Sequence, residues 1–147
     1  MSQQNFKVDQ VDHIHVYVSD RYRAAEWYRQ ILGLEIHKPF EFWAEDPNGP
    51  LTITSDGGNT EIALFQRDPK VEKRFSTVAF RTNGEGFLIF LELLATNEVF
   101  DQNGVKVTAN DVEDHEKSYS IYFNDPDGNP IELTTYDYDY VRERLKS

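Results

Sequence analysis

Polar and apolar residues alternate along the first predicted strand, residues 11–18. One face of this strand carries the aliphatic side chains Ile14, Val16 and Val18, and the other carries His13, His15 and Tyr17. After Asp20, a residue suited to cap a helix, the apolar residues change to helical spacing, and Gly33 stands where a helix-ending glycine belongs. The pattern therefore predicts a strand followed by a helix over residues 21–32.

Three short strands are predicted after this helix, because apolar runs alternate with turn sequences rich in Asp, Asn, Gly and Pro. They cover residues 34–42, 51–54 and 61–66. The order of elements in this part of the chain is thus β-α-β-β-β.

The same order repeats after a charged segment, residues 67–74, which we interpret as a linker. The repeat consists of a strand, a helix, three strands and a terminal helix, predicted over residues 75–82, 86–96, 105–109, 118–123, 130–135 and 137–146. The last strands of the two halves also match, since Ile-Ala-Leu at residues 62–64 corresponds to Ile-Glu-Leu at residues 131–133. We predict an α+β fold built from two βαβββ modules.

The two faces of these strands differ in chemistry. The aliphatic sets should pack under the helices, whereas the opposite faces mix aromatic and polar groups. The second set comprises His13, His15, Tyr17, Glu61, Ala63, Phe65, Thr77, Ala79, Arg81, Ser120, Tyr122, Glu132 and Thr134. This composition is typical of a small-molecule pocket, so we expect a small-molecule substrate or ligand.

The charge balance excludes several classes of partner. The 147 residues hold 26 acids against 15 bases, a net charge of −11, and the isoelectric point is about 4.7. Such a chain lacks the basic surface needed for nucleic acid or for an anionic membrane. It has no cysteine, and hence no disulfide or thiolate ligand. We expect no signal peptide, no membrane span and a cytoplasmic location.

Two sequence segments resemble the opening and closing motifs of the vicinal oxygen chelate superfamily, the glyoxalase, bleomycin resistance protein and extradiol dioxygenase group. The first is VDHIHVYVSD at residues 11–20, followed by Trp27-Tyr28 and Leu32-Gly33-Leu34; the second is SIYF at residues 120–123 with DPDGNPIEL at residues 125–133. The resemblance implies paired modules (about 9–67 and 75–137) in one domain, residues 9–137, whose sheets curl into a cup. It also implies a homodimer, and residues 138–147 then form a helical tail.

The resemblance further implies one divalent metal, Fe, Mn, Ni or Zn, held by residues of the first and last strands of the modules. The corresponding positions here are His13, Ala63, Thr77 and Glu132. His13 and Glu132 can ligate strongly, whereas Ala63 offers no ligand through its side chain and Thr77 stands where many members have histidine. His15 and Glu61 share the face of His13 and Ala63, respectively, and are weaker candidate ligands.

Other residues of the same face have expected roles in binding and chemistry. Tyr122 and Glu132 are the candidate catalytic residues, with Tyr122 donating a proton or a hydrogen bond. The candidate substrate-binding residues are Tyr17, Phe65, Thr77, Arg81 and Ser120. His37 and His115 have no partner that the sequence identifies.

Three functions fit this pattern. The first is a metal-assisted enzyme of the glyoxalase or dioxygenase type, that is, a lyase, isomerase or dioxygenase. In such an enzyme the metal coordinates oxygen atoms of the substrate. The second is a metal-free protein that binds a small molecule, as bleomycin resistance proteins do. The third is a structural domain whose cup is filled by its own side chains. The sequence does not identify the substrate.

Overall fold

The computed structural model describes residues 10–68 and 76–146. The polar N-terminal stretch, most of the predicted linker and the first residue of the predicted strand 75–82 lie outside these ranges. The chain divides into two compact units: residues 1–16 with 20–66, and residues 17–19 with 67–147.

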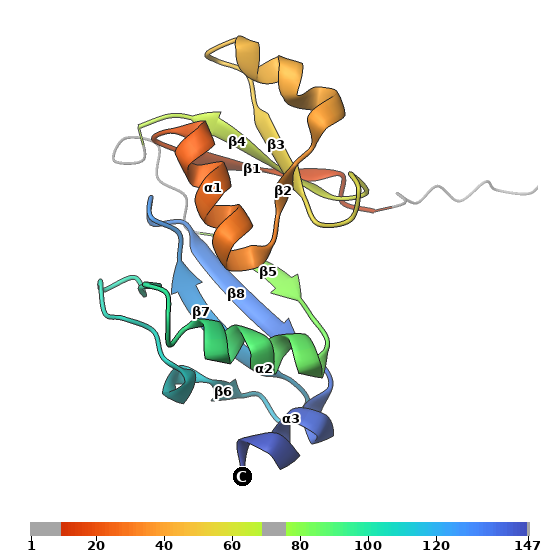
Figure 1. The fold of residues 1–147 in the computed structure, drawn as a ribbon, viewed down its shortest axis with the longest axis vertical. Coiled ribbons are helices and arrows are strands. Elements are labelled where there is room, and N and C mark those ends of the chain that lie inside the picture. Colours follow the sequence, from red (N-terminus) through yellow and green to blue (C-terminus); the bar gives the residue numbers. More distant parts are fainter. Residues whose placement is uncertain (1–9, 69–75, 147) are drawn as a thin grey trace, which may run out of the picture. The chain divides into compact units, whose positions relative to one another are not determined.

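The first unit carries a four-stranded sheet in the order β1-β4-β3-β2. Its elements are β1 (His13–Val18, of which the last two residues group with the second unit), α1 (Arg21–Leu32), β2 (Glu35–Ile36), a 3₁₀ helix η1 (Lys38–Glu45), β3 (Leu51–Thr54) and β4 (Glu61–Gln66). Figure 1 shows α1 lying along one face of this sheet. Asp20 caps the helix by accepting from the backbone N–H of Arg23. Gly33 ends it with φ of 72°, a left-handed conformation that glycine adopts at little cost.

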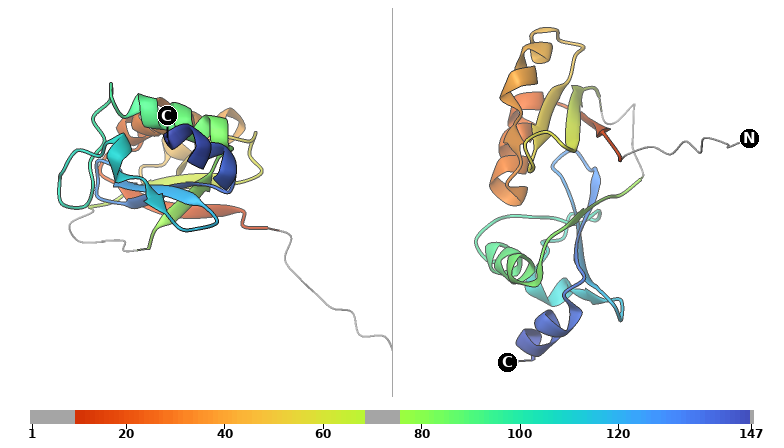
Figure 2. Two further views of the ribbon diagram at one scale, coloured as in Figure 1. Left: turned by 90° about the horizontal axis from the view of Figure 1, so that it is seen from below. Right: turned by 90° about the vertical axis from the view of Figure 1, so that its right-hand side faces the viewer.

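The second unit carries another four-stranded sheet, in the order β5-β8-β7-β6. Its elements are β5 (Val78–Arg81), α2 (Gly84–Leu93), a 3₁₀ turn η2 (Ala109–Asp111), β6 (Glu113–Asp114), β7 (Tyr119–Asn124), β8 (Pro130–Thr135) and α3 (Tyr138–Leu145). β8 pairs in parallel with β5 and antiparallel with β7. Figure 2 shows α2 and α3 on the same side of this sheet.

The alternation predicted for the strands is confirmed in the cores of the two units. Val16, Ile62 and Leu64 are buried in the first unit with apolar residues of α1. In the second unit, apolar residues of β7 and β8 are buried with the apolar face of α2, and the rings of Phe90 and Phe123 stack with centroids 5.4 Å apart. Fully burying one such side chain contributes about 1.5–3 kcal/mol, so these faces hold each helix on its sheet.

Two predicted strands are wrong. Of residues 34–42, only Glu35–Ile36 is a strand, and the chain then turns into η1. Pro39 explains the change, because its fixed φ and missing N–H suit the first turn of a helix better than a sheet. Residues 105–109 form no strand either; the chain there makes an isolated bridge between Phe100 and Lys106, and Ala109 begins η2. The predicted helix over 86–96 exists but starts and ends earlier, at Gly84 and Leu93.

A buried arginine ties η1 to α1. The guanidinium of Arg21 donates to the backbone carbonyls of Ala44, Asp46 and Gly49 at 3.0, 3.1 and 2.7 Å. Arg21 is only 8% exposed. One cation thus donates to three carbonyls in and after the last turn of η1, of which that of Asp46 also accepts from the backbone N–H of Gly49 at 2.9 Å.

Replacing this cation should destabilise the protein. We expect Arg21→Met to lower the free energy of unfolding by about 2 kcal/mol, because one buried and two part-buried carbonyls lose a charged donor. Urea unfolding measures the change. The exposed neighbour Arg23→Met is the control and should stay within about 0.5 kcal/mol of the wild type. Equal stabilities of the two variants would contradict the role assigned to Arg21.

Candidate functional site

The polar face of the second sheet centres on Glu132 of β8. The strand register places Glu132 between Ala79 of β5 and Tyr122 of β7. On β8 the flanking residues Ile131 and Leu133 are buried, whereas Glu132 is half-buried. Strand alternation therefore presents the carboxylate on the face opposite the buried apolar side chains.

Ser120 holds this carboxylate in place. Its hydroxyl donates to Glu132 Oε2 at 2.8 Å and lies 2.9 Å from the hydroxyl of Thr134. Thr134 in turn donates to the backbone carbonyl of Tyr119 at 3.2 Å. Ser120 is fully buried and Glu132 is half-buried, so the contact is partly sheltered from water. The carboxylate keeps acceptor capacity for a further partner, because it has two oxygens and about four lone-pair positions.

Tyr122 lies beside the carboxylate and is a proton-bearing group at neutral pH. Partial burial and the charge of Glu132 raise the pKa of Tyr122 above its usual value. Its hydroxyl lies 3.0 Å from Nε2 of His115, and the two rings meet edge to face. A phenol held in this way can donate a hydrogen bond to an oxygen that gains negative charge.

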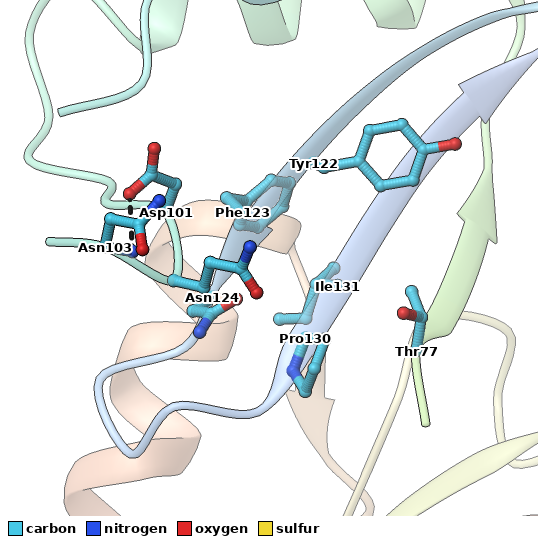
Figure 3. A pocket seen from close by; sticks show the side chains of 9 residues that line it. Thr77, Asp101, Asn103, Tyr122, Phe123, Asn124, Pro130 and Ile131 are labelled. Carbon is cyan, nitrogen blue, oxygen red and sulfur yellow. Dashed lines mark hydrogen bonds between the residues drawn. The ribbon is translucent and has the colours of Figure 1, made fainter. Parts of the chain in front are cut away.

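A shallow pocket of about 300 Å³ adjoins Tyr122 (Figure 3). Thr77 contributes one wall, and the loop at residues 101–103 contributes another. The complete lining is Thr77, Asp101, Gln102, Asn103, Tyr122, Phe123, Asn124, Pro130 and Ile131. Its size suits a small polar molecule, and of the expected substrate-binding residues it contains Thr77.

On the first unit, His13 and His15 lie together on one face of β1, as expected. Their rings stack with centroids 5.0 Å apart, and their Nε2 atoms are separated by 3.0 Å. Nδ1 of His13 is 2.8 Å from Oδ2 of Asp12. Phe65 of β4 contacts the ring of His15, with centroids 4.6 Å apart.

Glu61, expected as a weaker ligand, has a different partner. Its Oε1 lies 2.5 Å from Nδ1 of His37, and both side chains are largely buried, at 12% and 15% exposure. The sequence suggested no partner for His37, because its position depends on the turn that leads into η1. This contact occupies the carboxylate of Glu61, the weaker candidate ligand on the face of Ala63.

The remaining expected site positions are Arg81, Tyr17 and Ala63. Arg81 is exposed at the end of β5 and opposes Thr134 in the strand register. It lines an open surface concavity with Thr82, Asn83, Tyr136 and Asp137. Tyr17 is half-buried on β1. Ala63 is almost fully buried between its strand neighbours and offers no ligand from its side chain.

Within the described residues, no three histidine or acidic side chains lie together as a group that could hold an ion. Pairs of donors are present instead. In the same part of the chain, no helix is long and apolar enough to cross a bilayer.

Comparison with known proteins identifies the family. The sequence model described as the Glyoxalase/Bleomycin resistance protein/Dioxygenase superfamily matches residues 10–133. The chain belongs to this superfamily. The α+β fold of βαβββ order is shared with solved members of the superfamily, such as a glyoxalase/dioxygenase from Nostoc punctiforme, at 20% identity over 91% of this chain and 99% of that one, with a TM-score of 0.61.

Proteins that resemble this chain in sequence or in fold carry out different tasks. Metallothiol transferase FosB of Staphylococcus epidermidis is 30% identical over 133 residues, which cover 88% of this chain and 83% of FosB. The fosfomycin resistance protein FosX of Listeria monocytogenes shares the fold with a TM-score of 0.63 at 16% identity, over 92% of this chain and 99% of FosX. The antibiotic-binding protein TnmS3 of a Streptomyces species does so with a TM-score of 0.60 at 20% identity, over 90% of this chain and 99% of TnmS3.

The contact between Tyr122 and His115 can be tested directly. In Tyr122→Phe, the ring nitrogen Nε2 of His115 loses its hydroxyl partner, so its ¹⁵N chemical shift should move. The nitrogens of His37, which pairs with Glu61 in the other unit, should keep their shifts and provide the control. An unchanged His115 spectrum would show that the tyrosine hydroxyl does not bind this nitrogen in solution.

Proposed function

We propose that this protein is a divalent-metal-assisted enzyme that acts on a small polar molecule, with His13 and Glu132 as metal ligands. The observation that carries the proposal is the arrangement on β7 and β8, where Glu132 lies beside Tyr122 and is held by the buried Ser120. Carboxylates that bind metals are themselves commonly hydrogen-bonded, as Glu132 is by Ser120. Membership of the superfamily and the likeness to FosB support the same function.

The side chains of His13 and Glu132 carry donor atoms that suit a divalent metal ion. His13 presents a ring nitrogen whose opposite nitrogen contacts a carboxylate, and Glu132 retains lone pairs for a cation. Imidazole and carboxylate together suit Fe, Mn, Ni or Zn. When bound, a divalent ion would act as a Lewis acid toward an oxygen of the substrate.

The chain's own groups would then have separate tasks. Tyr122, protonated at neutral pH, would donate a hydrogen bond to the oxygen on which charge develops. His115 would hold the hydroxyl of Tyr122, and Ser120 would fix the direction of the Glu132 carboxylate. The pocket beside Tyr122, with Thr77 in its wall, would receive the substrate.

A metal-free binding protein is the second candidate. It is favoured by the lack, within residues 10–68 and 76–146, of three converging ligand side chains. It is also favoured by Ala63 and Thr77, which stand at two of the four positions where the resemblance implies metal ligands. TnmS3, which binds an antibiotic, illustrates such a role for this fold.

Metal analysis separates the two candidates. The protein, purified without a histidine tag and reconstituted with each ion in turn, should hold about one equivalent of Mn, Fe, Ni or Zn. His13→Ala and Glu132→Gln should each lose most of it, because each removes a direct ligand. The exposed acid Glu113, on β6, provides the control variant Glu113→Gln, which should retain the metal. A wild-type protein that binds none of the ions would favour the metal-free function.

A further inference from the structure

Three polar side chains at the start of β1 form a continuous chain of contacts. The carboxylate of Asp12 lies 2.8 Å from Nδ1 of His13, and Nε2 of His13 lies 3.0 Å from Nε2 of His15. The side chains of Asp12 and His13 are 89% and 42% exposed, so an ion from solution can reach them. All three residues belong to the first unit.

The contact with Asp12 fixes which nitrogen of His13 can bind a ligand. An ionised carboxylate only accepts hydrogen bonds, so Nδ1 of His13 carries the proton and donates it to Asp12. The lone pair of His13 is therefore on Nε2, the atom that faces His15. Without a metal, Nε2–H of His15 donates to this lone pair.

The 3.0 Å distance between the two Nε2 atoms also equals the distance between two nitrogen ligands of one metal ion. Nitrogens that lie about 2.1 Å from a metal and subtend a right angle at it are about 3.0 Å apart; at the tetrahedral angle they are about 3.4 Å apart. Residues two apart on a strand need convergent side-chain rotamers to reach this distance. Here Phe65 packs against the ring of His15, and His13 is held by Asp12.

We infer that His13 and His15 together form a two-nitrogen metal chelate, with Asp12 as the residue that positions His13. This inference rests on the proposed function and assigns His15 as a direct ligand to the same ion. On binding, the proton on Nε2 of His15 is replaced by the metal, and the neutral ring carries its proton on Nδ1 instead.

Binding of Mn(II) to the tag-free protein tests the assignment. Electron paramagnetic resonance measures the free ion and thus the dissociation constant, and pulsed measurements on the bound ion count the coordinated imidazoles. We expect two imidazoles in the wild type and one in His15→Ala and in His15→Gln, each with affinity lowered about 10-fold or more. Asp12→Asn should weaken binding about 10-fold and keep both imidazoles, since it removes only the orienting carboxylate.

The controls separate failure of this inference from failure of the proposed function. His37→Gln removes a histidine outside the pair and outside the proposed machinery, and it should keep both imidazole signals; circular dichroism checks that each variant is folded. If the wild type binds Mn(II) and loses it in His13→Ala, while His15→Ala binds within two-fold of the wild type, the assignment of His15 is overturned and the proposed function stands. If the wild type binds no divalent ion, both are overturned.

Discussion

The pairing of β8 on both of its edges is the constraint on which the second unit depends. Parallel pairing with β5 and antiparallel pairing with β7 put Ala79, Glu132 and Tyr122 in one row across the sheet. A shift of one residue would turn the carboxylate toward α2 and bring Ile131 or Leu133 to the polar face. Burying an unpaired carboxylate among apolar side chains is strongly unfavourable, so the core and the site fix the same register.

The same two-residue period determines the faces of β1, but side-chain contacts determine where the rings of His13 and His15 lie. Alternation puts His13 and His15 on one face and Val16 on the other, in the buried core. It does not bring the two rings together, because neighbours on one face of a strand start about 7 Å apart. The contacts of Asp12 with His13 and of Phe65 with His15 accompany the convergence of the Nε2 atoms. Backbone geometry thus places the two histidines on one face of β1, and local side-chain packing determines the distance between their Nε2 atoms.

Most of the fold could be predicted because it depends on local signals. Alternation located the main strands, and Asp20 and Gly33 located both ends of α1. The two wrongly predicted strands lie where contacts beyond the local sequence pattern determine the structure. Pro39 and the neighbouring aromatic rings, Phe40 on Trp43 at 4.6 Å, favour a 3₁₀ helix in a run that also alternates like a strand. Residues 105–109 have apolar residues in strand-like order but form no ladder with a neighbour.

Prediction of the candidate site was limited in a similar way. The strand faces were predictable from alternation, and Ser120, Tyr122 and Glu132 do share one face. The partners of His37 and His115 were not, because each histidine lies next to a turn whose geometry determines where its ring points. The 3.0 Å separation of the two Nε2 atoms depends on rotamers, which sequence spacing does not specify.

A crystal structure determined with Mn(II) would show whether a divalent ion binds at His13 and Glu132, as we propose. Diffraction data collected above and below the manganese absorption edge locate the ion without assumptions about its ligands. We expect an anomalous peak about 2.0–2.3 Å from Nε2 of His13 and from a carboxylate oxygen of Glu132, contributed by the same or a second copy of the chain. Well-ordered density at both residues with no anomalous peak beside either of them would show that these residues hold no ion.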